Sequence, residues 1–242
     1  HLLQRINTVV FKNPDELMAN VDCVTAFLRD KIIACGGDTE RDALYCKPTR
    51  TGKKYFVDGK DSVWRLYNFV ENSFSHNAIE SPEVFFNAGK AFGEFQRQLA
   101  DFPIDKLYET IPDFHNTPDR FKKFLAALKK DPLGRAATAR RETEFVKARE
   151  DFCSVLFDAH EQGKLPFRVT HNDTKVNNVM MNKITGDFLA VIDLDTVMPG
   201  SMLFDYGDGI RSCASNAKED EKDLSKVFLN LELFEAYTDG YM

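Results

Sequence analysis

The sequence has no two cysteines at the spacing of a metal-binding or redox motif. The five cysteines are an odd number without a close pair: Cys23, Cys35, Cys46, Cys153 and Cys213. This excludes a C-x-x-C zinc or redox site and argues against a disulfide-dense secreted scaffold. We therefore expect free thiols in a reducing compartment, and a cytoplasmic location.

The chain also lacks a long apolar run, a signal peptide and an excess of basic residues. A membrane helix needs roughly 18 consecutive apolar residues, which no segment provides. Lysine and arginine number 32 against 38 acidic residues, and the net charge of −6 is unlike that of a general nucleic-acid binder. With 43% hydrophobic residues among 242, we expect one large globular domain or two small ones, without a nucleic-acid or membrane partner.

Hydrophobic periodicity and capping residues predict a mixture of helices and strands. Asn13 begins one helix, and Ser81 begins another whose phenylalanine-rich face should enter the core. The Asp58-Gly59 dipeptide predicts a hairpin turn. Helices are expected at 13–33, 81–99, 119–130 and 138–162, with a polar, helix-prone tail from Lys218. Strands are expected at 2–10, on both sides of the hairpin turn within 53–70, and at 167–171, 178–182 and 188–194.

The polar connector 71–80 marks the expected domain boundary. It separates a β-rich section with one helix, residues 1–72, from a mainly helical section, residues 73–242. The first residue is His1, in a strand-like run, where a complete chain would begin with methionine. We therefore expect a fragment, or the ordered part of a longer chain.

A dense polar cluster, THNDTKVNNVMM, lies between two strand-like runs. The turn at 182–187 predicts a hairpin in which residues whose numbers sum to about 370 face each other. Asn178 should then meet Asp193 at the open end of the hairpin. Asp195 should share a strand face with Asp193, and Asp173 should lie in the loop before the first strand. Carboxylate and amide oxygens of this kind suit Mg²⁺, which binds through them and through substrate phosphates.

The spacing His171-x-Asp173-x-x-x-x-Asn178 matches the catalytic loop of protein kinases, apart from its middle arginine. By residue frequencies, these three residues occur at this spacing by chance in roughly one chain in a hundred of this length. Ordinary alternatives are a turn carboxylate for Asp173, a solvated strand end for Asp193 and a surface position for Lys175. Together with the hairpin and Asp193, the spacing favours phosphoryl transfer.

The stretches HNDTKVNN and VIDLDTVMPG resemble the aminoglycoside phosphotransferase-like small-molecule kinases, whose loop usually reads H-G-D-x-x-x-x-N followed by I-D-x-x. Within this family the sequence is most similar to the N-acetylhexosamine 1-kinases, with further likeness in LLQRIN, FKNPDELMANV, ETIPDFHNT and FDYGDGIRS. The resemblance implies an α+β, two-lobed protein-kinase-like fold. Its N-terminal, nucleotide-binding lobe would be truncated, at 1–72, and its catalytic C-terminal lobe, at 73–242, would stop early.

The resemblance also implies a role for each matched residue. Asp173 would be the catalytic base, and Lys175 would stabilise negative charge on the transferred phosphoryl group. Asn178 and Asp193 would hold Mg²⁺ at the ATP phosphates. Four other polar residues of these motifs are expected substrate contacts: Thr174, Asn177, Asp195 and Arg211. Asp195 could instead be a further metal ligand. His171, Asp205 and Asp208 are expected to brace the loop.

Two features of such kinases are missing from the N-terminal section. The first strand offers Gln4 and Arg5 in place of the lysine that pairs with a helix glutamate, so these two are candidate contacts to the ATP phosphates. No glycine-rich loop precedes that strand, and we expect one or two N-terminal strands to be absent from this sequence. The segment Asn68, Phe69 and Val70 lies where the kinase hinge binds adenine through its backbone.

Three functions are compatible with these features. The first is an ATP- and Mg²⁺-dependent kinase that phosphorylates the anomeric hydroxyl of N-acetylglucosamine or N-acetylgalactosamine, giving the sugar 1-phosphate. The second is the same chemistry on another amino sugar, an aminoglycoside or a small alcohol. The third is a pseudokinase that binds nucleotide or a partner without catalysis, and the intact set Asp173, Asn178 and Asp193 argues against it. No feature of the sequence assigns an oligomeric state.

Overall fold

The protein is described by a computed structural model that covers residues 1–78, 81–215, 217 and 221–242. Two compact units can be distinguished. The first combines residues 1–111 with residues 168–242, and the second comprises residues 112–167. The first unit contains all of the expected N-terminal section and part of the C-terminal one, so the predicted lobe boundary near residue 72 stays a prediction.

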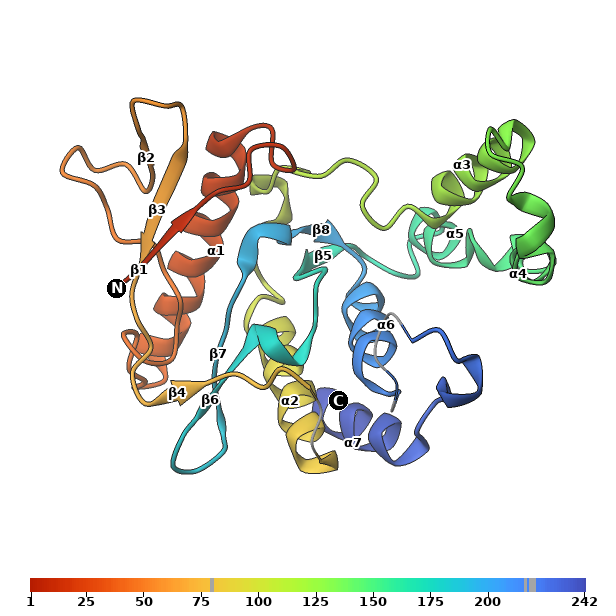
Figure 1. Cartoon of the computed structure of the whole chain (residues 1–242). Coiled ribbons are helices and arrows are strands. Elements are labelled where there is room, and N and C mark those ends of the chain that lie inside the picture. The colour runs from red at the N-terminus through yellow and green to blue at the C-terminus, as the bar shows by residue number, and fades with distance from the viewer. Residues whose placement is uncertain (79–80, 216, 218–220) are drawn as a thin grey trace. The chain divides into compact units, whose positions relative to one another are not determined.

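The first unit draws its helices and strands from both ends of the chain (Figure 1). The strands are β1 (Leu2–Arg5), β2 (Phe56–Val57), β3 (Val63–Tyr67), β4 (Ser73–Phe74), β5 (Arg168–Thr170), β6 (Val179–Asn182), β7 (Phe188–Val191) and β8 (Met198–Gly200). The α-helices are α1 (Pro14–Ala34), α2 (Pro82–Gln98), α6 (Met202–Cys213) and α7 (Leu231–Tyr241). Short 3₁₀ turns are η1 (Ile104–Lys106), η4 (Val176–Asn178), η5 (Leu194–Thr196) and η6 (Leu224–Lys226). The strands pair antiparallel in the orders β1-β3-β2, β4-β6-β7 and β5-β8.

The first strand is shorter than its sequence predicts, because a turn follows it. The strand expected at 2–10 ends at Arg5. The Asn7 side-chain oxygen accepts a hydrogen bond from the Val9 amide at 3.1 Å, and its carbonyl accepts one from the Phe11 amide at 2.9 Å. An asparagine bonded to the backbone two residues on offers the chain an alternative to the sheet ladder. The expected hairpin at Asp58-Gly59 is confirmed, since β2 and β3 pair on either side of it.

The starts of the two long helices are confirmed by their caps. The Asn13 side chain accepts a hydrogen bond from the Glu16 amide in α1, and the Ser81 side chain accepts one from the Val84 amide in α2. The phenylalanine-rich face of α2 is buried, as expected: Phe85, Ala88, Ala91, Phe92, Phe95 and Leu99. Periodicity and capping therefore placed both helices and the buried face of α2 correctly.

One hydrophobic cluster of the first unit joins α1 to the elements around the polar cluster. Leu17 and Val21 of α1 pack in the same buried group as Val169 of β5 and as Leu194 and Val197, which follow β7. Because this core is continuous, the N-terminal sheet and its helix are packed against the segment that carries Asp193 and Asp195.

A second cluster packs α2 against α7, and the two helices lie side by side in Figure 1. Gly89 and Gly93 of α2 allow this close approach. A Cβ atom at Gly89 would overlap the Tyr237 carbonyl, and one at Gly93 would overlap the Tyr241 carbonyl. The helix backbones touch at these positions, so only glycine fits without displacement.

The second unit is helical, with α3 (Thr117–Lys130), η2 (Ala136–Ala139), α4 (Arg140–Lys147), η3 (Glu150–Phe152) and α5 (Val155–Glu161). The helix expected at 119–130 is confirmed, whereas the single helix expected at 138–162 is wrong. The break follows from Arg149, whose guanidinium donates to the Phe145 carbonyl at 2.9 Å and lies over the Phe145 ring. That carbonyl would otherwise accept the backbone amide of residue 149 in a continuing helix.

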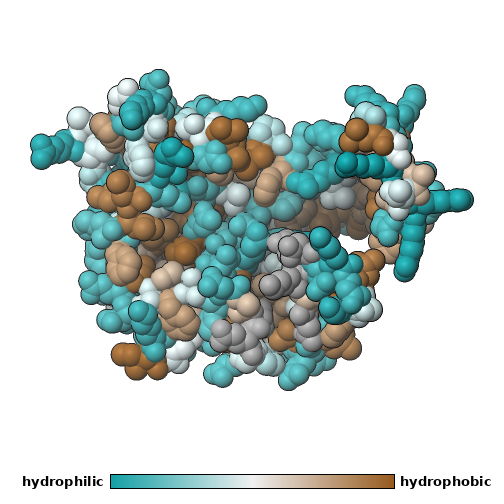
Figure 2. Space-filling model, in the orientation of Figure 1, coloured by the Kyte–Doolittle hydropathy of each residue, from teal (hydrophilic) through white to brown (hydrophobic). Residues whose placement is uncertain are grey.

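The five cysteines are unpaired, as their spacing predicts. Within the described ranges, no helix is long and apolar enough to cross a membrane. On the face shown in Figure 2, apolar side chains lie in separate patches among hydrophilic ones. Residues 79–80 of the connector and residues 218–220, where the polar tail was expected to begin, lie outside the described residues.

Candidate active site

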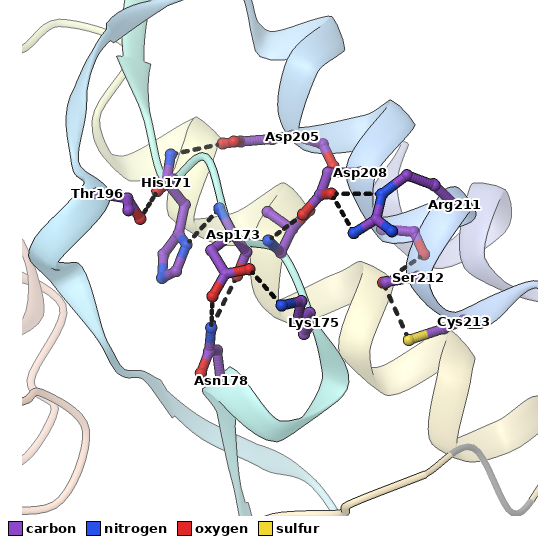
Figure 3. A network of polar contacts seen from close by, with 12 residues as sticks. His171, Asp173, Lys175, Asn178, Thr196, Asp205, Asp208, Arg211, Ser212 and Cys213 are labelled. Atoms are coloured by element: carbon purple, nitrogen blue, oxygen red, sulfur yellow. Dashed lines mark hydrogen bonds and ion pairs between the residues drawn. The ribbon is translucent and has the colours of Figure 1, made fainter. Parts of the chain in front are cut away.

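The polar cluster forms the loop between β5 and β6, and its side chains converge with those of α6 and of the segment after β7 (Figure 3). His171 is fully buried at the start of this loop. The edges of Phe92 and Phe95 enclose its ring, with centroid distances of 5.4 and 5.9 Å. Its Nδ1 accepts the Asp173 amide at 3.3 Å, so Nε2 carries the proton and donates to the Ile192 carbonyl at 2.9 Å. The imidazole thus ties the loop to the end of β7.

The Asp173 carboxylate is held by two donors from its own loop (Figure 3). Asn178 Nδ2 donates to Asp173 Oδ2 at 3.0 Å and to the Asp173 carbonyl at 2.8 Å. Lys175 Nζ lies 3.1 Å from Asp173 Oδ1. The Asp173 side chain is 30% exposed. A carboxylate that is both oriented and reachable from solvent can accept a proton from a bound hydroxyl group.

The β6–β7 hairpin has the predicted register. Val179 pairs with Val191, and the numbers of these two residues sum to 370. At the open end, the Ile192 amide donates to the Asn178 carbonyl at 2.9 Å. Asp193 therefore follows directly after the residue bonded to Asn178, and the expected meeting of the Asn178 and Asp193 side chains stays a prediction.

Asp193 has an unusual backbone conformation and a carboxyl group with a raised pKa. Its backbone has φ = 57° and ψ = 57°, the left-handed conformation, which costs energy for a residue other than glycine. Although the residue is exposed, partial desolvation raises the pKa of its carboxyl, and the nearby Asp195 and Asp173 carboxylates raise it further. A cation beside Asp193 would relieve this electrostatic cost.

Asn178 and Asp193 are the residues that fit a metal ion in this arrangement. The Asn178 amide nitrogen is bonded to Asp173, which turns the amide oxygen away from that carboxylate. Among residues 1–78, 81–215, 217 and 221–242, no three histidine, cysteine, aspartate or glutamate side chains form a closed metal cage. Mg²⁺ does not need one, because it keeps waters and binds through one or two carboxylates together with substrate phosphates. An amide oxygen and one solvent-exposed carboxylate satisfy this requirement.

Asn172 is a functional residue of the loop to which the sequence assigned no role. Its backbone has φ = 67°, and its Nδ2 donates to the Thr196 carbonyl at 2.8 Å. The related loops carry glycine here, which adopts positive φ at no cost. Asparagine is among the few other residues that tolerate this conformation, so the departure from H-G-D preserves the backbone path. The glycine in the family pattern was the signal that could have revealed this requirement.

Asp205 on α6 anchors the loop backbone from within the core. Its carboxylate accepts hydrogen bonds from the His171 amide at 2.9 Å, the Asn172 amide at 2.7 Å and the Gln96 side chain at 2.7 Å. Burial raises the pKa of Asp205, and these three donors oppose that shift. A fully buried carboxylate is tolerable because its acceptor sites are occupied.

Thr174 and Arg211, both expected to contact substrate, have partners on the scaffold. The Thr174 hydroxyl is buried and donates to the Asp205 carbonyl at 2.6 Å, while its amide donates to the Asp208 carboxylate at 3.0 Å. Arg211 pairs with the same Asp208 at 2.9 Å. The geometry therefore favours bracing roles for both, and substrate contacts by them stay predictions. Asn177 is exposed beside the loop, and its role in binding also stays a prediction.

Asp195 does not lie on a strand beside Asp193, as its spacing suggested. It belongs to the 3₁₀ turn η5, where strand alternation does not apply, and its carboxylate lies 2.6 Å from the buried Arg65 guanidinium of β3. Arg65 was not identified as a site residue from the sequence. The signal was available in β3, since alternation places Arg65 on the same buried face as Val63 and Tyr67.

The candidate nucleotide contacts are dispersed over β1 and the segment after β3. The Gln4 side chain turns inward and accepts from Arg65, whereas Arg5 is exposed. Asn68 is buried, with its side-chain oxygen accepting the Tyr45 amide at 2.9 Å. Of its neighbours, Val70 is buried and Phe69 is exposed. Adenine binding along Asn68, Phe69 and Val70 and phosphate binding by Gln4 and Arg5 stay predictions.

Comparison with known proteins gives this arrangement a family context. The sequence pattern of the phosphotransferase enzyme family (APH) matches residues 47–228, more than half of the chain, including the catalytic loop and Asp193. Amicoumacin kinase hAmiN, in complex with AMP-PNP, Ca²⁺ and Ami, has a similar fold, with a TM-score of 0.58 at 12% identity over 99% of this chain and 64% of that one.

Two further solved structures share the fold. An aminoglycoside phosphotransferase from Alicyclobacillus acidocaldarius subsp. acidocaldarius has a TM-score of 0.53 at 13% identity, covering 86% of this chain and 60% of that one. The microcompartment-associated aminopropanol kinase has a TM-score of 0.50 at 15% identity, covering 99% of this chain and 67% of that one. The expected α+β, kinase-like fold is confirmed. This chain spans less than two thirds of the length of hAmiN and of the aminoglycoside phosphotransferase.

Proposed function

Because this chain belongs to the phosphotransferase enzyme family, we propose that it transfers the γ-phosphoryl group of ATP to a hydroxyl group of a small molecule. The observation that carries the proposal is the arrangement around Asp173. Its carboxylate is oriented by Asn178 and Lys175, and the solvent-exposed Asp193 lies at the adjoining end of the hairpin.

The chemistry assigned to each residue follows from charge and position. Asp173 accepts the proton of the acceptor hydroxyl, whose oxygen forms the new bond to the γ-phosphorus as the bond to the leaving ADP oxygen breaks. Lys175, with its side chain 37% exposed, places a positive charge beside the γ-phosphoryl group during its transfer. Asn178 and Asp193 hold Mg²⁺, which when bound neutralises the charge of the ATP phosphates.

We propose N-acetylglucosamine or N-acetylgalactosamine as the acceptor, phosphorylated at the anomeric hydroxyl. Support comes from the sequence likeness outside the catalytic loop, in ETIPDFHNT and FDYGDGIRS. Another small alcohol or an aminoglycoside is the second candidate. The names of two proteins with similar folds, amicoumacin kinase and aminopropanol kinase, favour including such acceptors in any test.

An acceptor panel tests the proposal directly. ADP release is measured with ATP and Mg²⁺ in the presence of N-acetylglucosamine, N-acetylgalactosamine, an aminoglycoside or aminopropanol, and ³¹P NMR locates the phosphate on the product. We expect turnover with an N-acetylhexosamine and an anomeric phosphate. Turnover with the aminoglycoside or aminopropanol alone would refute the sugar assignment and retain the phosphotransferase.

Asp173→Asn tests the assigned base. The variant should lose about 10²- to 10⁴-fold in kcat, as expected for removal of a general base, while its affinity for nucleotide is unchanged. Asp187→Asn, in the exposed turn between β6 and β7, is the matched control, and this variant should phosphorylate the acceptor at the normal rate. Normal phosphorylation by Asp173→Asn would show that the base is elsewhere. Nucleotide binding without turnover of any acceptor by the unmodified protein would favour a pseudokinase.

A further inference from the structure

Arg65 is a buried cation that the proposed reaction does not yet use. Its side chain is 1% exposed, and its guanidinium lies 4.8 Å from the centre of the Tyr67 ring. A buried charge is costly unless it is paired and hydrogen bonded. Its position therefore requires partners, and these partners connect it to the proposed metal site.

The guanidinium joins the N-terminal sheet to the turn after β7. Its Nε and Nη2 donate to Gln4 Oε1 of β1 at 3.0 and 2.7 Å. Its Nη1 lies 2.6 Å from Asp195 Oδ1 and 3.9 Å from Met18 Sδ of α1. The guanidinium of Arg65 thus contacts β1, α1 and the turn that follows Asp193.

That turn is short and held at several points. Asp195 is two residues after Asp193, within the single 3₁₀ turn η5. Leu194 is buried in the core, and the Thr196 hydroxyl donates to the His171 carbonyl at 2.6 Å. The Arg65–Asp195 contact fixes the side of the turn that faces β3. A shift of Asp195 would therefore move the left-handed Asp193, because one residue separates them.

We propose that Arg65 is a positioning residue that acts through Asp195 to hold Asp193 in its metal-binding position. This proposal rests on the proposed function, in which Asp193 binds the metal ion. Arg65 itself is enclosed by protein and bonded to Gln4 and Asp195, so it acts on the site through the turn. The ion pair from β3 to the turn after Asp193 links the two sections.

Asp195→Asn tests this role with almost no change in side-chain shape. Mn²⁺ binding to the nucleotide-free protein is followed by electron paramagnetic resonance of the free ion. We expect Mn²⁺ affinity to fall by about 10- to 100-fold, the usual effect of removing an outer partner of a metal ligand. The Mg²⁺ concentration for half-maximal velocity should rise by the same factor, while the KM for the acceptor stays unchanged.

Arg65→Lys tests the other side of the pair. Lysine keeps the positive charge but lacks the planar fork that reaches Gln4 and Asp195 together, so an intermediate loss of Mn²⁺ affinity is expected. Lys31→Met is the matched control. It breaks the exposed Lys31–Asp101 ion pair on α1 and should bind Mn²⁺ as the unmodified protein does.

The outcomes separate this proposal from the proposed function. Unchanged Mn²⁺ affinity in folded Asp195→Asn and Arg65→Lys would overturn it. If either variant does not fold, the double variant Arg65→Met with Asp195→Leu removes both buried charges, and unchanged affinity there would overturn it equally. Mn²⁺ binding without phosphorylation of any acceptor would refute the proposed function and leave the role of Arg65 in metal binding intact. An unmodified protein that binds no Mn²⁺, either alone or with a non-hydrolysable ATP analogue, would refute both.

Discussion

Replacing Asn172 by glycine or by alanine separates the backbone requirement of the catalytic loop from the hydrogen bond of its side chain. Asn172 has φ = 67°, and its amide group donates to the Thr196 carbonyl at 2.8 Å. Both variants lose that hydrogen bond. Alanine alone, unlike glycine, also places a Cβ atom in a left-handed backbone, next to Asp173, the proposed base.

The magnitudes follow from these two contributions. Loss of the hydrogen bond costs about 1 kcal/mol in both variants. Compared with glycine, alanine pays about 1–2 kcal/mol for the left-handed conformation. About half of this cost is offset because the unfolded chain of the alanine variant has less conformational entropy than that of the glycine variant. We therefore expect Asn172→Gly to lose about 1 kcal/mol of unfolding free energy and Asn172→Ala about 2 kcal/mol.

Urea unfolding of the metal-free protein measures these values, and kcat at saturating ATP, Mg²⁺ and acceptor measures the effect on catalysis. Asn172→Gly should retain most of the turnover, because glycine follows the same backbone path and Asp205 still binds the loop amides. Asn172→Ala should lower kcat more, because relief of the strain displaces Asp173. Equal or greater stability of the alanine variant would refute the reasoning.

Two further predictions concern the charge of Asp193 and the close helix contact at Gly89. Asp193→Asn should raise the melting temperature of the metal-free protein at neutral pH, and equal melting temperatures there would contradict this. Partial desolvation and the Asp195 charge raise the folded pKa of Asp193, so its carboxyl stabilises the fold fully below the unfolded pKa and loses this contribution as pH rises through the folded one. Gly89→Ala should lower the urea unfolding free energy by about 1–3 kcal/mol, because its Cβ would overlap the Tyr237 carbonyl. Gly207→Ala, with no atom within 4 Å, is the control and should be neutral or stabilising by up to about 1 kcal/mol; equal losses in both would argue against close helix contact.

Local sequence patterns determined the frame of the proposed active site. The spacing of His171, Asp173 and Asn178 predicted the loop, and the turn at 182–187 predicted the hairpin register in which Val179 pairs with Val191. This succeeds because strand alternation and turn position fix the register of a hairpin without reference to the rest of the chain. Capping residues at Asn13 and Ser81 located the two long helices for the same reason.

Expectations failed where a side chain competed with the backbone pattern. The Asn7 side chain ended the first strand early, and the Arg149 guanidinium took a carbonyl that a longer helix would have used. Both residues stand in runs whose hydrophobic spacing favoured continuation. Periodicity counts apolar positions and does not register which hydrogen bond a polar side chain will make.

The sequence by itself indicated the family and the proposed roles of Asp173, Asn178 and Asp193, because these depend on short-range spacing. Only the tertiary structure showed that Asp195 pairs with Arg65, 130 residues earlier in the chain, and that Asp205, expected to brace the loop, does so through the His171 and Asn172 amides. These contacts are decided by burial. A charge removed from water must take whichever partner the packed elements bring near, and no local pattern specifies that partner.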